Sequence, residues 1–228
     1  MKLGDIKNLD PQKKKFFATY GKNMGNVTLG LDLSLRELRD MSVIRNSQNE
    51  ENGDEAQRSL DSNHADGLAL HTLVGLVQTQ ILKDRLAGID TTRVENLQKQ
   101  IGQSPYAVLQ PMVCNIRDCE KGGEDLEIEW IIRLLPNGEK LKINSILEVH
   151  LGSSQPLSVV DGQHRRAGFD IAFDWLLKVC SERKYPTNLI KVVDTNTQGN
   201  IIDQEIHDFW QRVLDIAWGD AHVKVEVH

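Results

Sequence analysis

The sequence has little of what marks secreted or membrane-spanning proteins. It contains only three cysteines, Cys114, Cys119 and Cys180, with no CxxC pair among them. This odd set argues against a disulfide framework and against a thiolate zinc site. No uninterrupted apolar run approaches the roughly 18 residues that a membrane-spanning helix needs, and the first residues lack the apolar core of a signal peptide. We therefore expect a cytoplasmic protein with reduced cysteines and no membrane partner.

An excess of positive charge is also absent. The 33 acidic residues outnumber the 27 lysines and arginines, which gives a net charge of −6. This balance excludes a protein that binds polyanions over its whole surface, so any contact with DNA needs a local basic patch. Residues 1–45 are the one mildly basic segment, and Lys13-Lys14-Lys15 is its densest run. Such a run either contacts phosphates or forms an ordinary solvated face.

The first hundred residues combine a weak strand, an unstructured stretch and helices. Asn46 to Gly67 is polar and acidic with almost no large apolar residues, which predicts a mobile loop or linker. Around it we expect a strand over 26–31, a helix over 34–41 with a Ser34–Glu37 capping box, a helix over 68–86, and a helix from about 90 to Gly102 with a Thr92–Glu95 capping box. His71, on the helix over 68–86, is interpreted as a core or boundary residue.

The remaining residues alternate between strand and helix patterns. We expect strands over 106–116, 126–133, 157–160, 188–194 and 222–228, helices over 165–181 and from Asp203 onward, and a turn at 136–139 followed by a strand over 140–149 or a short helix over 144–149. The last strand stops at the final residue. A domain seldom ends on an unfinished strand, so we expect this chain to be the N-terminal part of a longer protein.

The densest polar chemistry lies between the apolar strand at 157–160 and the helix that begins at about 165. Asp161-Gly162-Gln163-His164-Arg165 places an acid, an imidazole and a guanidinium within five positions. Glycine lets a ligand approach the backbone, and the start of a helix offers free N–H groups and a positive dipole end. The sequence therefore predicts a phosphate site here.

Helical spacing separates the two arginines of this region. Arg166 recurs with Asp170, Asp174 and Lys178 every four residues, which predicts a solvent-facing polar stripe with an Arg166–Asp170 pair. Arg165 points instead toward the predicted buried face of the helix. A guanidinium there needs an anionic partner or several acceptors. That partner is either a phosphate or a carboxylate of the protein itself.

The other motif residues have two interpretations each. Asp161 either caps the helix by accepting backbone N–H bonds or holds a metal ion and the attacking water. His164 is a candidate general acid or base, because the unperturbed imidazole pKa lies near ~6.5. Gln163 is a candidate for orienting a water or contacting a phosphate oxygen. The alternative for both is a polar side chain that only packs the loop.

Residues 157–168, LSVVDGQHRRAG, resemble the defining motif of the DGQHR-domain proteins, which include the DndB family associated with DNA phosphorothioate modification. All five motif residues are present, after an apolar strand and before a helix. The family is similar to the ParB/sulfiredoxin superfamily, whose members bind nucleotide phosphates with the equivalent strand, loop and helix. The related DGQQR proteins of modification-dependent restriction, which couple nucleotide hydrolysis to DNA cleavage, are also similar at this motif.

The resemblance implies a fold and a division of the chain. The fold is α+β, with a ParB/sulfiredoxin-like mixed sheet flanked by helices and a largely helical N-terminal part. Residues 1–103 would form a basic segment, a polar linker and a helical region. Residues 104–228 would form the DGQHR domain, which in DndB-like proteins extends well beyond the point where this chain stops.

The resemblance also implies an activity. Asp161 and His164 would be catalytic, Asp161 would hold Mg²⁺, and Gly162, Gln163 and Arg165 would bind the phosphates of a nucleoside triphosphate. The protein would hydrolyse this nucleotide and act on or at DNA, with partner proteins of a bacterial or phage DNA-modification or defence system. The alternatives are a DndB-like DNA-binding transcriptional regulator without catalytic activity, and an assembly protein with a relict motif.

Overall fold

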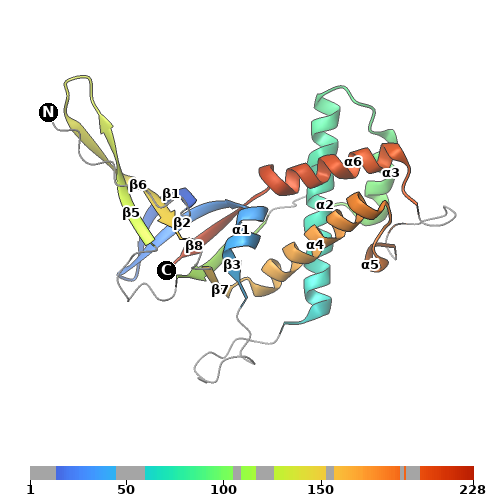
Figure 1. Cartoon of the computed structure of the whole chain (residues 1–228), viewed down its shortest axis with the longest axis horizontal. Coiled ribbons are helices and arrows are strands. Elements are labelled where there is room, and N and C mark those ends of the chain that lie inside the picture. Colours follow the sequence, from blue (N-terminus) through green and yellow to red (C-terminus); the bar gives the residue numbers. More distant parts are fainter. Residues whose placement is uncertain are drawn as a thin grey trace.

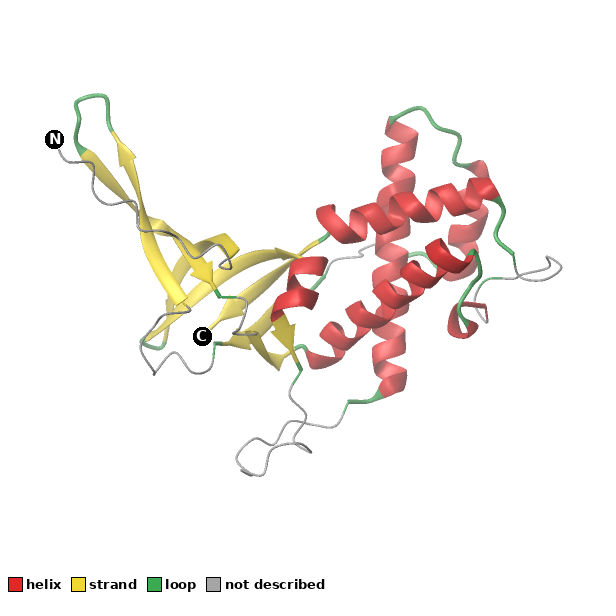
Figure 2. Ribbon diagram, viewed as in Figure 1, coloured by secondary structure: helices red, strands yellow, loops and turns green. Residues whose placement is uncertain are grey.

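A twisted mixed sheet and a group of crossing helices lie side by side in this protein (Figures 1 and 2). The structure is a computed structural model that describes residues 14–44, 60–104, 109–116, 126–152, 157–190, 193 and 201–228. The fold is therefore α+β, as expected. None of the helices in these ranges is long and apolar enough to cross a membrane.

The described strands form one eight-stranded sheet in the order β3-β7-β4-β8-β2-β1-β6-β5. The pairs β3–β7 and β4–β8 are parallel, and the other neighbours are antiparallel. The strands are β1 (Lys14–Asn23), β2 (Asn26–Ser34), β3 (Ser42–Val43), β4 (Met112–Asn115), β5 (Leu126–Leu134), β6 (Lys140–Leu151), β7 (Leu157–Asp161) and β8 (His222–Val227).

The centre of the sheet joins the two ends of the chain. The hairpin β1–β2 lies between β6 and β8, with Ala18 opposite Leu147 and Leu31 opposite Val225. The N-terminal part thus contributes central strands as well as helices, and the expected boundary at residue 103 runs through a single sheet. β8, the strand that ends the chain, is paired on both sides.

Side-chain alternation explains which face of the sheet is buried. On β8, Val223, Val225 and Val227 are buried while His222 and Lys224 are exposed. This period of two is what a strand covered on one face requires. The prediction of a terminal strand is confirmed, as are the strands over 126–133 and 157–160, the strand rather than helix over 140–149, and the turn at 136–139.

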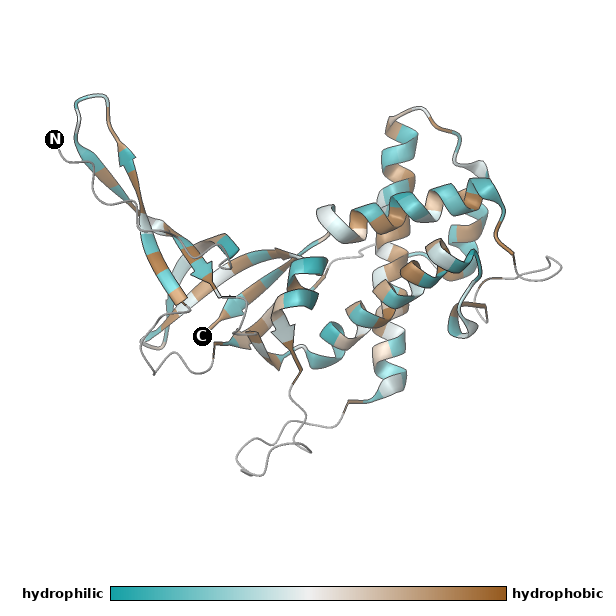
Figure 3. Ribbon diagram, viewed as in Figure 1, coloured by the Kyte–Doolittle hydropathy of each residue, from teal (hydrophilic) through white to brown (hydrophobic). Residues whose placement is uncertain are grey.

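The helices form a layer beside the sheet in which α4 and α6 pack against the long α2 (Figure 1). Hydropathy varies around each helix, with apolar residues along α2 and polar residues toward its first turns (Figure 3). The helices are α1 (Leu35–Met41), α2 (Ser62–Leu86), α3 (Thr92–Ile101), α4 (Gln163–Glu182), α5 (Thr187–Ile190) and α6 (Gln204–Asp215), followed by the π-helical turn η3 (Ile216–Asp220).

Local capping chemistry fixes most helix ends. The Ser34–Glu37 capping box is present, Asp203 accepts the N–H of Ile206, and Gly102 caps α3. The predicted Thr92–Glu95 box is wrong, because Thr91 occupies the N-cap and its hydroxyl contacts Glu95 instead.

Three other predictions need correction. The predicted loop over 46–67 ends too late, because Asp61 accepts the N–H groups of Asn63 and His64 and α2 already begins at Ser62; residues 45–59 lie outside the described ranges. The predicted strand over 188–194 is wrong at its start, where the carbonyl of Pro186 accepts two N–H groups of α5. The predicted strand over 106–116 is shorter, since β4 covers only Met112–Asn115 and residues 105–108 are not described.

The described cysteines are free thiols, as expected. Cys114 is fully buried in β4, and burial raises the pKa of its thiol to about 12. Cys180 is half-buried in α4, and burial raises its pKa to about 11. Because the thiolate is the reactive form, neither thiol is suited to nucleophilic or metal chemistry near neutral pH. Cys119 lies outside the described ranges.

The crossing of α2 and α4 depends on a glycine. A Cβ atom at Gly168 would lie 2.9 Å from the Cβ of Leu68 and 3.1 Å from backbone atoms of Ala65 and Ala69. The two backbones therefore approach too closely for any side chain at this point. The contact holds the start of α4, and with it the motif loop, against α2.

We predict that Gly168→Ala lowers the free energy of unfolding by about 1–3 kcal/mol, because the added methyl group forces the helices apart. Gly67→Ala is the matched control: it lies on exposed α2 surface with no atom within 4 Å of the added Cβ. Alanine there should raise stability by about 0.5–1 kcal/mol through helix propensity. Urea denaturation followed by tryptophan fluorescence measures both. Equal effects of the two substitutions would contradict the close crossing.

Candidate functional site

The DGQHR motif spans the junction between β7 and α4. Asp161 ends the strand, Gly162 is the N-cap with φ 94° and ψ 21°, and Gln163 begins the helix. This left-handed conformation favours glycine. A Cβ on Gly162 would also lie 2.8 Å from Met112 and 3.0 Å from the guanidinium of Arg165. Glycine is therefore needed both for the turn and for the space that the arginine occupies.

Arg165 folds back over this glycine and is held within the loop. Its Nη1 donates to the carbonyl of Pro111 at 2.6 Å, and its Nη2 donates to Oδ2 of Asp161 at 3.0 Å. The Arg165 side chain is 19% exposed and the Asp161 side chain 73% exposed. Of the two partners expected for this guanidinium, the structure supplies the carboxylate. Within this pair, the Asp161 carboxylate is the group exposed to solvent.

Asp161 is not the helix cap. The N-cap is Gly162, which has no side chain, and no side-chain hydrogen bond caps α4. The capping interpretation of Asp161 is therefore wrong, because the residue lies one position too early, in β7 opposite Val113. The first-turn N–H groups of a helix lack intrahelical acceptors. Among the described residues, no side chain accepts the first N–H groups of α4, and the cationic side chain of Arg165 lies beside them.

His164 connects the motif to α2. Its Nε2 accepts the backbone N–H of Asp61 at 3.0 Å, and its ring meets the ring of His64 edge to face with centroids 5.0 Å apart. Nε2 of His164 is thus occupied in holding Asp61, the residue before α2. Gln163 is half-buried, and within the described ranges its amide has no hydrogen-bond partner.

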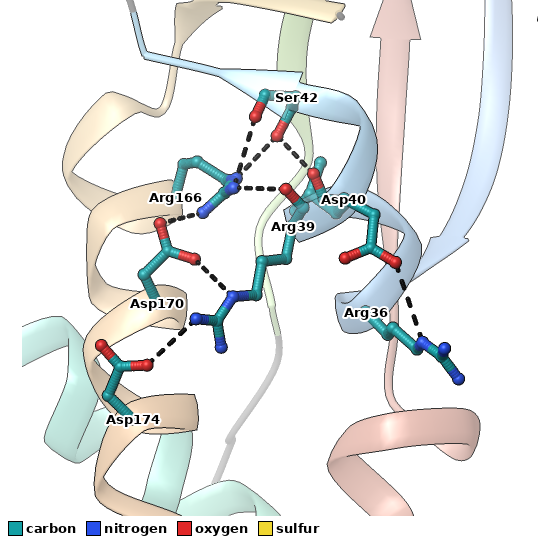
Figure 4. A network of polar contacts seen from close by, with 8 residues as sticks. Arg36, Arg39, Asp40, Ser42, Arg166, Asp170 and Asp174 are labelled. Atoms are coloured by element: carbon teal, nitrogen blue, oxygen red, sulfur yellow. Dashed lines mark hydrogen bonds and ion pairs between the residues drawn. The ribbon is translucent and has the colours of Figure 1, made fainter. Parts of the chain in front are cut away.

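Arg166 is buried, so the predicted solvent-facing stripe is wrong at this residue, whereas Asp174 and Lys178 are exposed as predicted. It is 4% exposed, its Nε donates to Oγ of Ser42 at 2.6 Å, and its Nη2 donates to the carbonyl of Arg39 at 2.9 Å (Figure 4). The expected ion pair with Asp170 is present. Helical spacing placed these residues on one face correctly. At Arg166 that face is covered by α1 and β3, however, which spacing alone does not show.

The same face of α4 continues into a charged network. Arg39 of α1 lies 3.6 Å from Asp170 and 3.0 Å from Asp174, so two acids of α4 lie between two arginines (Figure 4). Lys178, the next residue in the spacing, is exposed. This network binds α1 and the start of β3 to α4. It is structural support for the motif rather than part of a ligand site.

A cavity of about 600 Å³ borders the motif through Pro111, whose carbonyl holds Arg165. It lies between α2, the η3 turn and strands β2 and β8. Ionisable side chains line it together with apolar ones: Asp32, His71, Asp220, His222, Lys224, Leu76, Leu109 and Ile216. Sequence analysis missed these residues, since they come from segments far apart in the chain. His71, which the sequence indicated only as a core or boundary residue, lies on the cavity wall.

Charges in this cavity are partly paired. Lys83 binds Asp220, and this contact holds the pKa of the Asp220 carboxyl below its usual range. Nδ1 of His222 lies 4.0 Å from Oδ1 of Asp32. The wall thus carries both signs of charge around an apolar centre. Such a cavity suits a ligand that has apolar faces and polar edges.

The described residues contain no group of three or more histidine, cysteine, aspartate or glutamate side chains arranged for a metal ion. Asp161 would therefore be a single carboxylate ligand. Protein-bound Mg²⁺ commonly has one or two carboxylates, several waters and the phosphates of a substrate. The exposed Asp161 carboxylate fits that pattern when a phosphate supplies further ligands.

The two described lysines of the basic run near the N-terminus lie beside acidic residues. Lys14 lies 4.0 Å from Asp40, and Lys15 lies 2.6 Å from Glu148. Lys13 is outside the described ranges. The two described lysines therefore lie next to acids, which matches the interpretation of a solvated, ion-paired face.

Comparison of the chain with protein-family models, with curated proteins and with solved structures found no match.

The two motif arginines should differ sharply in their effect on stability. We predict that Arg166→Ala lowers the free energy of unfolding by about 3 kcal/mol, because it leaves Asp170 and the acceptors of α1 and β3 without their buried donor. Arg165→Ala should cost about 1 kcal/mol, because its carboxylate partner is largely solvated. Urea denaturation compares the two variants. A larger loss for Arg165→Ala would contradict the assignment of Arg166 as the structural arginine.

Proposed function

We propose that this protein binds a nucleoside triphosphate at the DGQHR loop and hydrolyses it, as a DndB-like member of a DNA-modification or defence system. The observation that carries the proposal is the start of α4. There the uncapped N–H groups, the left-handed Gly162 and the guanidinium of Arg165 converge next to Pro111, which also lines a cavity. Backbone N–H groups at a helix start together with an arginine form a phosphate site.

The Arg165–Asp161 pair suggests how the phosphate is received. Nη2 of Arg165 contacts a carboxylate that is 73% exposed, so this contact is exchanged for a phosphate oxygen at low cost. Nη1 stays anchored to Pro111 and keeps the guanidinium in place. Asp161, once released, is free to hold Mg²⁺ or to orient the attacking water. Positioning and charge neutralisation provide most of the catalysis in phosphoryl transfer.

The neighbouring cavity provides room for the nucleoside. Its volume of about 600 Å³ and its mixture of Leu76, Leu109 and Ile216 with histidines and acids suit a base and a sugar. The phosphates would then extend past Pro111 toward Arg165. The ParB/sulfiredoxin-like character of the fold, the role at DNA and the partner proteins rest on the motif resemblance.

A second candidate is the DNA-binding regulator without catalytic activity. One observation favours it: Nε2 of His164 accepts the N–H of Asp61, and the guanidinium of Arg165 donates to Pro111 and Asp161, so contacts within the protein engage both motif side chains. A motif of this kind supports structure or nucleotide sensing as well as turnover.

We predict that Arg165→Ala weakens the binding of ATP or GTP at least about tenfold, since a charge-assisted hydrogen bond is lost. Asp161→Asn should preserve binding, because removing the carboxylate frees the guanidinium, while turnover with Mg²⁺ falls at least about 100-fold. Titration calorimetry and phosphate release measure the two effects. Lys178→Ala, on an exposed position of the same helix, is the matched control and should change neither.

The outcomes separate the candidates. Absence of nucleotide binding by the wild-type protein, or binding that Arg165→Ala leaves intact, would overturn the phosphate site. Nucleotide binding without turnover, together with promoter-DNA binding that survives Asp161→Ala, would select the regulator.

A further inference from the structure

The hairpin formed by β5 and β6 projects beyond the rest of the sheet as an arm (Figure 1). β6 pairs with β1 only through residues 146–151, and β5 pairs only with β6 among the described strands. β5 is therefore the outermost described strand. An edge strand presents a row of backbone N–H and C=O groups that can pair with another strand.

One face of β5 carries exposed apolar side chains, while its charged residues lie on the other face. Ile128, Ile132 and Leu134 are 43%, 56% and 68% exposed and lie at even-numbered positions of β5. The β5–β6 pairing shifts register between Trp130 and Ile132, but Lys142, the partner of Ile132, lies over the ring of Trp130, so the row continues on one face. Proteins usually protect an edge with charges or prolines. An exposed apolar row on a projecting strand instead marks an interaction surface.

Trp130, in the middle of β5, is held by side chains of β1 and β6. The ring of Trp130 meets Tyr20 of β1 edge to face, with centroids 5.2 Å apart, and Nζ of Lys142 lies 3.7 Å from the centre of its ring. Side chains of β1 and β6 thus hold Trp130 in place, while no described strand pairs with the outer edge of β5. A surface ordered before binding loses less conformational entropy when a partner arrives.

The charges on β5 indicate which partner fits. Glu129 and Arg133 lie on the opposite face from the apolar row, and among the described residues neither has an ion-pair partner. When two copies of β5 are laid antiparallel with Ile131 opposite Ile131, Glu129 of each copy faces Arg133 of the other. The same register places Ile128 opposite Leu134 and Trp130 opposite Ile132.

We propose that two copies of this chain join edge to edge through β5, antiparallel and centred on Ile131. The arrangement has two-fold symmetry, so each favourable contact occurs twice. It yields two Glu–Arg pairs and five apolar cross-strand pairs, the central Ile131–Ile131 pair included, with no like charges opposed. A register centred on Trp130 would use Glu127 instead, which already has an interaction within the chain. The proposal uses no property of the DGQHR motif.

Charge reversal tests this register. We expect the wild-type chain to sediment as a concentration-dependent dimer in analytical ultracentrifugation. Glu129→Arg or Arg133→Glu alone places like charges opposite each other twice, which should raise the dissociation constant at least about tenfold. The double variant carrying both changes should regain the wild-type dimer. An equimolar mixture of the two single variants should form a heterodimer in preference to either homodimer, because both cross-pairs then become attractive.

Controls keep folding apart from association. Glu182→Arg and Lys178→Glu reverse exposed charges on α4 and should leave the dissociation constant unchanged. Circular dichroism and the thermal midpoint of each variant confirm that the monomer is intact. A wild-type protein that stays monomeric up to the highest soluble concentration would overturn the proposal and assign the edge to another partner. A dimer that ignores charge reversal, or a mixture that fails to associate, would also overturn it.

Discussion

The placement of the motif depends on one buried charge. Arg166 is almost fully enclosed between α4, α1 and β3, and a buried guanidinium is tolerated only when its donors are satisfied. Its hydrogen-bond acceptors are Ser42 and the carbonyl of Arg39, and its Nη1 forms an ion pair with the carboxylate of Asp170. Because Ser42 and Arg39 belong to β3 and α1, the start of α4 can occupy only a narrow range of positions. The position of the loop between β7 and α4 is therefore restricted as well, because this loop leads directly into α4.

The two adjacent arginines therefore have different roles: Arg166 stabilises the fold, and Arg165 is the candidate ligand-binding residue. Arg166 faces the covered side of α4 and connects three elements. Arg165, one residue earlier, lies over Gly162 and reaches the open side, where its partner Asp161 is solvated. A ligand can exchange with a solvated partner far more easily than with a buried network. This difference supports Arg165 as the phosphate ligand in the proposed function.

The two proposals concern opposite ends of the molecule and different kinds of recognition. The motif and its cavity lie where β7, β8 and the helices meet, and they offer charge and backbone donors to a small anionic ligand. The β5 edge lies at the far side of the sheet and offers apolar side chains and unpaired backbone groups to another strand. Dimer formation there would leave the motif of each copy accessible, because β7 and β5 are separated by the width of the sheet.

The sequence by itself determined the local elements of this protein. Period-two alternation marked β5 and β8, capping residues such as Ser34 and Asp203 marked helix starts, and the glycine in the motif marked the turn into α4. These features depend on neighbours within a few residues, so they can be read along the chain. Helical spacing also placed Arg166 and Asp170 on one face and paired them.

Tertiary structure alone decided what covers each face. Nothing near Arg166 in the sequence indicates that α1 and β3, more than a hundred residues earlier, bury it. The same holds for the cavity wall, where His71, Asp32 and His222 meet from three distant segments. It also holds for the strand predicted over 188–194, where a proline carbonyl favours a helical turn instead. Burial depends on contacts between residues far apart in the chain. A single sequence shows which side chains can be buried, but not which segments cover them.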